Sequence, residues 1–139
     1  MQSLADRLLD VELPVTKLSR QVFRALMEQT LARKEGEFLV VVGEPGCGKS
    51  HLRRQLFRDA QKHFCTPDRP MGCIQLVLEA APNLLALTRQ IARAYNNPAT
   101  MHKILDKSKN DVSFEVLGDI ERQATSVIFI DEAHNMTFK

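Results

Sequence analysis

The chain has 139 residues, a length that suits one domain or part of one. Hydrophobic residues make up 44% and charged residues 26%, which excludes an intrinsically disordered chain. No apolar run approaches the roughly 18 residues of a membrane span. Lys and Arg number 19 and Asp and Glu 17, so the net charge of +2 is too small to indicate nucleic-acid binding by electrostatics alone.

The N-terminus and the cysteines bear on the compartment. The first residues include an acid and contain no apolar signal-peptide core. The three cysteines, Cys47, Cys65 and Cys73, match no zinc-site spacing and are expected to be reduced thiols. We therefore expect a cytoplasmic protein that has no membrane partner.

Two helices are predicted at the start of the chain. Leucines within residues 4–9 predict a short helix that stops near Pro14. Apolar residues then recur at three- and four-residue steps over residues 18–31, which predicts an amphipathic helix. Thr16 is the expected N-cap of this second helix, and Gly36 is expected to end it.

Two predicted strands follow, with a helix between them. Residues 38–42 are apolar on both faces and rich in β-branched side chains, which is typical of a strand buried in a parallel sheet. A helix is expected over residues 50–63, and the prolines within residues 66–70 predict a loop. Residues 73–78 form the second predicted strand.

Helix and strand patterns continue to alternate in the rest of the chain. A helix is expected from residue 82 to Tyr95, closed by the sequence Asn-Asn-Pro at 96–98. The elements expected after it are a short helix over residues 100–105, a polar break at 107–110, a helix over 112–124 and a third strand over 127–130. This alternation predicts an α/β fold with a parallel sheet.

The strongest motif in the sequence is a glycine-rich loop. Residues 43–50 satisfy every fixed position of the phosphate-loop pattern G-x-x-x-x-G-K-[ST], or Walker A motif. Glycines in such a loop let backbone N–H groups point inward around phosphate oxygens at the positive end of a helix. Lys49 would reach the terminal phosphates, and the Ser50 hydroxyl would bind Mg²⁺. We assign nucleotide binding to Gly43, Glu44, Pro45, Gly46, Cys47, Gly48, Lys49, Ser50 and His51.

Two acids follow the third predicted strand. Asp131 and Glu132 come directly after four apolar residues, as in a Walker B strand, and ligands bind at this carboxyl edge of open α/β sheets. Asp131 is expected to hold Mg²⁺ together with Ser50, and Glu132 is expected to be the catalytic residue that polarises the attacking water. The predicted cofactors are ATP and Mg²⁺.

The residues leave other functions open. Residues 131–134 spell Asp-Glu-Ala-His, a tetrapeptide of nucleic-acid motors in which His134 would couple nucleotide state to a moving strand. A further alternative is an ATP-binding interaction module that does not hydrolyse ATP. The basic residues of the predicted helix at 50–63 would either touch DNA phosphates or form a solvated face; they are Arg53, Arg54, Arg58 and Lys62.

The two motifs together resemble those of a known family. GEPGCGKS after FLVVV, and VIFIDEAHNM after a helix, resemble the AAA+ ATPases, and residues 80–94 are similar to the MuB/TniB/TnsC and ExeA-like branch that includes DNA-transposition ATPases. The resemblance implies a P-loop NTPase fold with three α/β/α layers and binding of ATP with Mg²⁺. It also implies homo- or hetero-oligomers of AAA+ subunits on DNA, and hydrolysis that switches a transposase or another partner.

The resemblance also implies that the chain is incomplete. The family's sheet has a further strand between the one that contains Val41 and the one that contains Ile128, and this chain would supply three of the five core strands. A sensor residue and an arginine finger would lie beyond Lys139, so we leave open whether the chain alone is an ATPase. We expect a fragment, a truncated reading frame or a chain completed by a partner. Residues 1–16 are assigned to an N-terminal extension and 17–139 to the N-terminal half of a P-loop ATPase domain.

Overall fold

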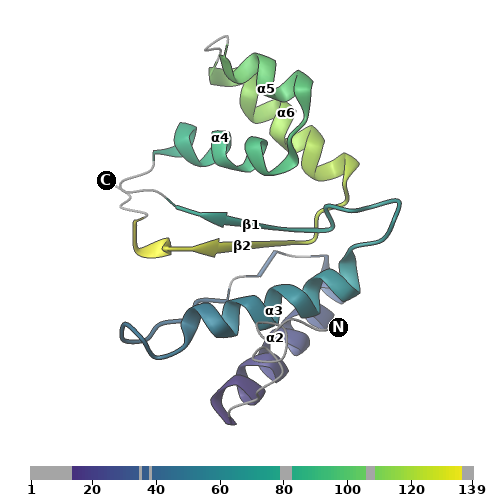
Figure 1. Ribbon diagram of the computed structural model, residues 1–139. Coiled ribbons are helices and arrows are strands. Elements are labelled where there is room, and N and C mark those ends of the chain that lie inside the picture. Colours follow the sequence, from purple (N-terminus) through teal and green to yellow (C-terminus); the bar gives the residue numbers. More distant parts are fainter. Residues whose placement is uncertain (1–13, 35, 38, 79–82, 106–108, 136–139) are drawn as a thin grey trace, which may run out of the picture. The chain divides into compact units, whose positions relative to one another are not determined.

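The protein is described by a computed structural model that divides into two compact units, Met1–Asp59 and Ala60–Lys139 (Figure 1). Each unit is described by itself. The residues that the structure describes are 14–34, 36–37, 39–78, 83–105 and 109–135. The helix predicted within residues 4–9 lies outside them. Within these ranges, no helix has the length and apolar character needed to cross a membrane.

The first described helix, α2 (Pro14–Arg33), begins earlier than its sequence pattern predicts. Proline lacks an N–H and has a preset φ, so it suits the first position of a helix. Thr16 therefore lies inside the first turn, and its assignment as N-cap was wrong. The helix ends before Lys34, which has a left-handed φ of 57°, so Gly36 is not the residue at which the chain leaves the helix.

An ion pair joins α2 to the next helix, α3 (Lys49–Phe64), whose bounds confirm the helix predicted at 50–63. Arg20 Nε donates to Asp59 Oδ2 over 2.8 Å, and a second Arg20 nitrogen donates to Asp59 Oδ1 over 3.0 Å. Two parallel charge-assisted hydrogen bonds fix orientation as well as distance. Phe23 of α2 is buried, whereas Leu18 and Leu31 of the same helix are exposed.

The strand predicted at 38–42 is not present among the described residues of that run. Residues 39–42 have no regular secondary structure, and Val42 is 89% exposed. Phe38 lies outside the described residues. Because a strand exists only through hydrogen bonds to a neighbouring strand, high β-propensity does not form one without a partner. No described segment forms a ladder with residues 39–42.

The other two predicted strands are confirmed and lie in the second unit. β1 (Cys73–Val77) and β2 (Val127–Asp131) run parallel, and their register aligns Cys73 with Val127 and Val77 with Asp131. Ile74 and Leu76 of β1 are buried, and Gln75 between them is exposed. The described sheet thus has two strands, and Asp131 lies at the carboxyl end of both.

Three helices lie between the two strands in the sequence, namely α4 (Leu84–Tyr95), α5 (Pro98–Leu105) and α6 (Lys109–Arg122). The Asn83 side chain accepts a hydrogen bond of 2.8 Å from the Ala86 N–H and so caps α4. Asn96 ends α4 in the left-handed conformation, and Pro98 begins α5. α6 begins at Lys109, so residues 109 and 110 of the predicted polar break at 107–110 belong to a helix, and residues 107 and 108 lie outside the described residues.

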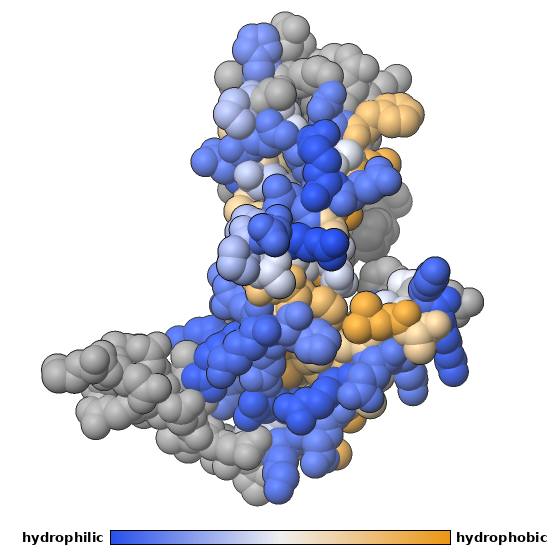
Figure 2. Space-filling view, turned by 90° about the vertical axis from the view of Figure 1, so that its right-hand side faces the viewer, coloured by the Kyte–Doolittle hydropathy of each residue, from blue (hydrophilic) through white to orange (hydrophobic). Residues whose placement is uncertain are grey.

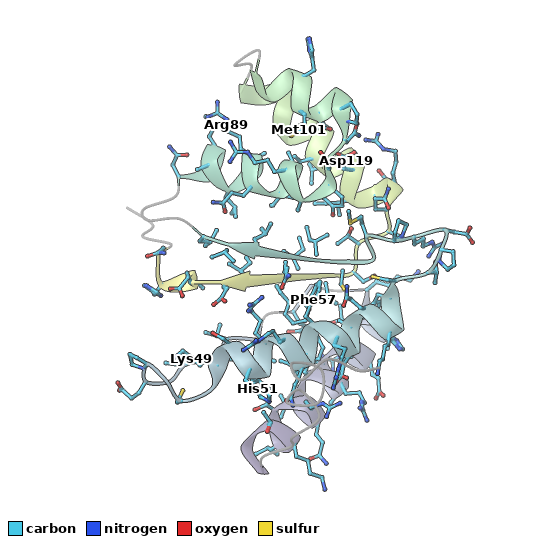
Figure 3. All side chains as sticks on the ribbon, viewed as in Figure 1. Lys49, His51, Phe57, Arg89, Met101 and Asp119 are labelled. Carbon is cyan, nitrogen blue, oxygen red and sulfur yellow. The ribbon has the colours of Figure 1, made fainter. Side chains whose placement is uncertain are left out.

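The helices of this unit share a small apolar core. α4 and α5 pack against α6, and α4 also packs against β1. Ala92 of α4 and Val116 of α6 are buried together, with Ile91, Met101 and Ile120 packed against them. Met101 is labelled in Figure 3. Other apolar side chains of the helices reach the surface, as the orange atoms in the upper part of Figure 2 show, and Phe114 is 76% exposed.

A buried carboxylate holds the helices together. Asp119 of α6 is 3% exposed and accepts hydrogen bonds from Asn97 Nδ2 over 2.6 Å, from Thr100 Oγ1 over 2.7 Å and from Arg122. Burial alone would raise the pKa of Asp119, but these hydrogen bonds and the Arg122 charge outweigh it and leave the pKa lowered. The network ties α6 to Asn97, which lies between α4 and α5, and to Thr100 in the first turn of α5.

A second set of hydrogen bonds holds Thr125 and Ser126, the two residues before β2. The Tyr95 hydroxyl donates to Thr125 Oγ1 over 2.6 Å, and that hydroxyl donates in turn to the Met71 carbonyl over 2.7 Å. Ser126 N–H donates to the Gly72 carbonyl over 2.8 Å. The residues before β2 are therefore fastened both to α4 and to the residues before β1, which sets the register of the strands.

Candidate functional site

The glycine-rich loop has a backbone that only glycine adopts readily. Gly46 and Gly48 have φ values of 80° and 94°. In this left-handed region a Cβ meets the neighbouring backbone. A hydrogen bond of 3.2 Å from the Cys47 N–H to the Glu44 carbonyl closes the turn. A Cβ on Gly43 would lie 2.6 Å from the Cys47 sulfur, so a side chain at residue 43 would force the Cys47 side chain to move.

The Lys49 ammonium is directed back over this loop. Its Nζ donates to the Gly43 carbonyl and, over 2.7 Å, to the Glu44 carbonyl, and it lies 3.8 Å from the Cys47 sulfur. The two oxygen acceptors are uncharged backbone carbonyls. Phosphate oxygens carry negative charge and are stronger acceptors for an ammonium than carbonyls are. The Lys49 ammonium can therefore exchange the Gly43 and Glu44 carbonyls for the oxygens of an anion without a movement of α3.

A pocket of about 200 Å³ opens at this point and is lined by Gly46, Gly48, Lys49 and Ser50. Lys49 and His51 lie at the amino-terminal end of α3 (Figure 3). The first turn of α3 contains no acidic residue, so the positive end of the helix dipole is not neutralised there. Space, backbone donors and positive charge together fit a phosphate group.

The predicted nucleotide residues take different parts in this arrangement. Four of them line the pocket, and Gly43 and Glu44 supply the carbonyls that hold Lys49. Cys47 contributes its backbone turn and a sulfur that packs over Gly43. Pro45 and His51 do not line the pocket, so nothing in its geometry assigns them a contact.

The acidic edge is built around a residue with an unusual backbone. Glu132 directly follows β2 and has a left-handed φ of 57°, a conformation that costs a non-glycine residue roughly 1 kcal/mol. The Asp131 side chain offsets part of this cost, because its Oδ1 accepts a hydrogen bond of 2.9 Å from the Glu132 N–H. The turn directs the chain away from the sheet immediately after Asp131.

Two further residues hold this turn in place. The short helix η1 (Ala133–Asn135) follows, and the Asn135 amide donates to the Leu78 carbonyl over 3.0 Å. The Leu78 N–H donates in turn to the Asp131 carbonyl over 3.1 Å, which extends the pairing beyond β1. His134 Nδ1 lies 3.4 Å from Glu132 Oε2. The sequence motifs gave Asn135 no role, and an amide soon after a strand-ending acid pair is the signal that could have found it.

Ser50 and Asp131 are the two residues that the sequence motifs predict as ligands of Mg²⁺. In the described part of the chain, no group of three His, Cys, Asp or Glu side chains comes together. Magnesium is usually bound by one or two protein oxygens together with substrate phosphates and water. The Ser50 hydroxyl and the Asp131 carboxylate are oxygen ligands of this kind. They belong to different units of the chain.

Comparison with known proteins agrees with these motifs. A family model described as AAA domain matches residues 32–139, which is most of the chain. The chain therefore belongs to the AAA domain family. Membership implies the P-loop NTPase fold, which is an α/β fold. By family the chain is an AAA-type P-loop ATPase, and members of this family bind nucleotide. No curated protein and no solved structure matches the chain.

Proposed function

We propose that this chain binds ATP together with Mg²⁺ through residues 43–51 and the acidic pair Asp131 and Glu132. The observation that carries the proposal is the pocket at the start of α3, where two left-handed glycines adjoin Lys49 and Ser50. Family membership supports ATP as the nucleotide and Mg²⁺ as the ion.

Each residue has a role that follows from its chemistry. Lys49 releases the two loop carbonyls and donates to phosphate oxygens, while the loop N–H groups surround the rest of the phosphate. Ser50 and Asp131 supply oxygen ligands to Mg²⁺, which when bound neutralises phosphate charge. Glu132 accepts a hydrogen bond from water and orients it for attack on the terminal phosphate.

We further propose that the chain acts as a DNA-associated regulator in the cytoplasm, as part of an oligomer of AAA+ subunits that controls a transposase. The support is the resemblance of the two motifs and of residues 80–94 to the MuB/TniB/TnsC and ExeA-like branch. On α3, Arg54 and Lys62 are exposed and available to phosphates, whereas the guanidinium Nε atoms of Arg53 and Arg58 are buried. Contact with DNA would therefore involve Arg54 and Lys62 first.

Binding of a fluorescent ATP analogue in the presence and absence of Mg²⁺ tests the proposal. Lys49→Ala removes the phosphate-facing charge, and loss of a charge-assisted interaction should weaken binding about 100-fold. Lys62→Ala is the matched control, because it removes an exposed lysine from the other end of the same helix. Equal binding by wild type and Lys49→Ala would contradict the nucleotide assignment.

The role of Glu132 is separable from binding. Glu132→Gln keeps the size of the side chain but removes its basicity, so the analogue should bind as in wild type while phosphate release falls at least about 100-fold. Single-turnover assays with radiolabelled ATP measure the release. Glu121→Gln, which changes an exposed acid on α6, is the control. Normal turnover in Glu132→Gln would remove Glu132 from catalysis and leave the binding assignment intact.

A further inference from the structure

Two of the three cysteines lie side by side, outside the proposed nucleotide site. The sulfur atoms of Cys65 and Cys73 are 3.7 Å apart, and both residues belong to the unit Ala60–Lys139. Both are free thiols. The third cysteine, Cys47, is exposed in the glycine-rich loop of the other unit. We call the pair Cys65 and Cys73 the dithiol.

The backbone, rather than the two side chains alone, brings the dithiol together. The Cys65 N–H donates to the Gln61 carbonyl over 2.9 Å and so continues the last turn of α3, whereas Cys73 is the first residue of β1. Thr66 and Arg69 exchange two backbone hydrogen bonds of 3.1 and 3.0 Å, which folds the intervening loop back on itself (Figure 1).

Gly72 is what allows the loop to close. A Cβ built on Gly72 would lie 2.0 Å from the Phe64 carbonyl oxygen, a separation that no side chain tolerates. Only glycine lets the start of β1 approach the end of α3 this closely. The sulfur separation is thus imposed by a glycine contact on one side and by the helix end on the other.

The two thiols differ in accessibility. Cys73 is 4% exposed, and burial, followed by its contact with Cys65, raises the pKa of its thiol to about 12. Cys65 is partly exposed and is therefore the sulfur that a dissolved oxidant reaches first. A disulfide has a sulfur–sulfur distance of about 2.05 Å, so the two atoms must approach by less than about 2 Å.

We propose that the dithiol is a reversible oxidation site that takes a hydroperoxide, such as hydrogen peroxide, as its oxidant. With hydrogen peroxide, the Cys65 sulfur attacks one peroxide oxygen, the O–O bond breaks, and the Cys65 proton leaves with the other oxygen as water, so that Cys65 becomes a sulfenic acid. The Cys73 sulfur then attacks the Cys65 sulfur, the S–OH bond breaks, and the Cys73 proton leaves with the hydroxyl as a second water. The two sulfurs lose two electrons in all, and the two peroxide oxygens gain them.

The resulting disulfide would join the end of α3 to the start of β1. This is the amino end of the strands, whereas Asp131 and Glu132 follow their carboxyl end. Oxidation should therefore restrain the loop and stabilise this unit without altering the acidic edge. The inference is independent of the proposed nucleotide function, and its test does not use nucleotide.

Intact mass and thermal unfolding test the proposal. The Cys47→Ser chain, in which only the dithiol remains, is treated with hydrogen peroxide, and the matched control also has Cys65→Ser. The first should lose the mass of two hydrogen atoms as a monomer, and its unfolding midpoint should rise by about 10 °C, since closing a short loop stabilises by constraining the unfolded chain. Dithiothreitol should reverse both changes. The control should not lose this mass.

Two outcomes would overturn the proposal. They are a mass gain of oxygen atoms without loss of hydrogen, and a disulfide between two chains. If Cys47→Ser fails to fold, peptide mapping of the oxidised wild-type chain identifies which two cysteines the disulfide joins. A peptide that links Cys65 to Cys73 supports the proposal, and one that links either to Cys47 contradicts it.

Discussion

Two short apolar runs in this chain have nearly the same character and different structures. Residues 39–42 and residues 127–130 are both apolar and rich in β-branched side chains, and each is followed directly by a predicted functional motif. The second run forms β2, whereas the first has no regular structure, and Val42 is 89% exposed. Composition therefore marks a segment as able to form a strand, and a partner decides whether it does.

The difference has a visible cause around β2. Its residues pair in register with β1, and the residues before it form hydrogen bonds to Tyr95 and to Gly72.

The motifs that follow the two runs also differ in whether their backbone geometry depends on distant residues. The glycine-rich loop keeps its left-handed geometry although no strand precedes it, because that geometry is local. The turn at Glu132 depends on Leu78, more than fifty residues away in the sequence.

The largest difference in unfolding free energy between the two apolar runs is expected for proline substitutions. Phe129→Pro introduces a residue without an N–H into the middle of a paired strand, and we expect the free energy of unfolding to fall by more than about 2 kcal/mol. Val41→Pro makes the same change in the unpaired run and should change it by less than about 0.5 kcal/mol. Urea unfolding followed by circular dichroism measures both. A large loss in Val41→Pro would mean that residues 39–42 are paired in solution.

An intermediate effect is expected from the carboxylate that supports the helix leading into β2. Asp119→Asn keeps the shape of the side chain but removes the charge that Arg122, Asn97 and Thr100 donate to, and we expect a loss of about 2 kcal/mol. Glu121→Gln, on the exposed side of α6, should have almost no effect. Thermal unfolding compares the two variants, and equal stabilities would show that the network does not support α6.

The Asp119 carboxylate should also make the stability of the fold depend on pH. The pKa of Asp119 is lowered in the folded chain, so between the folded and the unfolded pKa the unfolded chain binds more protons than the folded chain. The contribution of Asp119 to stability is therefore fully present above the unfolded pKa of about 3.9. It is lost as the pH falls through the lower folded value. Stability measured from pH 6 downward should decline less steeply below about pH 4 in Asp119→Asn than in wild type.

The smallest effect is expected in the loop that follows the unpaired run. Gly46→Ala forces a Cβ into a left-handed backbone and should lower the free energy of unfolding by about 1 kcal/mol. Gly36→Ala is the matched control, because no atom lies within 4 Å of its Cβ position and its φ is not left-handed. The variants are compared by urea unfolding. Equal stabilities would indicate that the loop geometry is not kept in solution.

The sequence predicted most of the helices and both strands of the described sheet, and four of the nine residues that it assigned to nucleotide binding line a pocket. These predictions rest on periodicity, proline positions and a loop motif, all of which act over a few residues. Two end assignments failed for a local reason, since Pro14 can begin a helix without Thr16 as a cap, and Lys34 leaves the helix before Gly36 is reached. The strand at 38–42 failed because β-propensity contains no information about a partner.

The sequence by itself determined what short-range chemistry controls: the α/β alternation, the left-handed glycines and the positions of Lys49 and Ser50 at the start of α3. Only the tertiary structure decided which apolar run pairs, how Asn135 reaches Leu78 and why Cys65 meets Cys73. Each of these depends on contacts between residues distant in the chain or on a close backbone approach at one glycine. Backbone preferences act within a few residues, whereas hydrogen-bonded pairing requires two segments to meet in space.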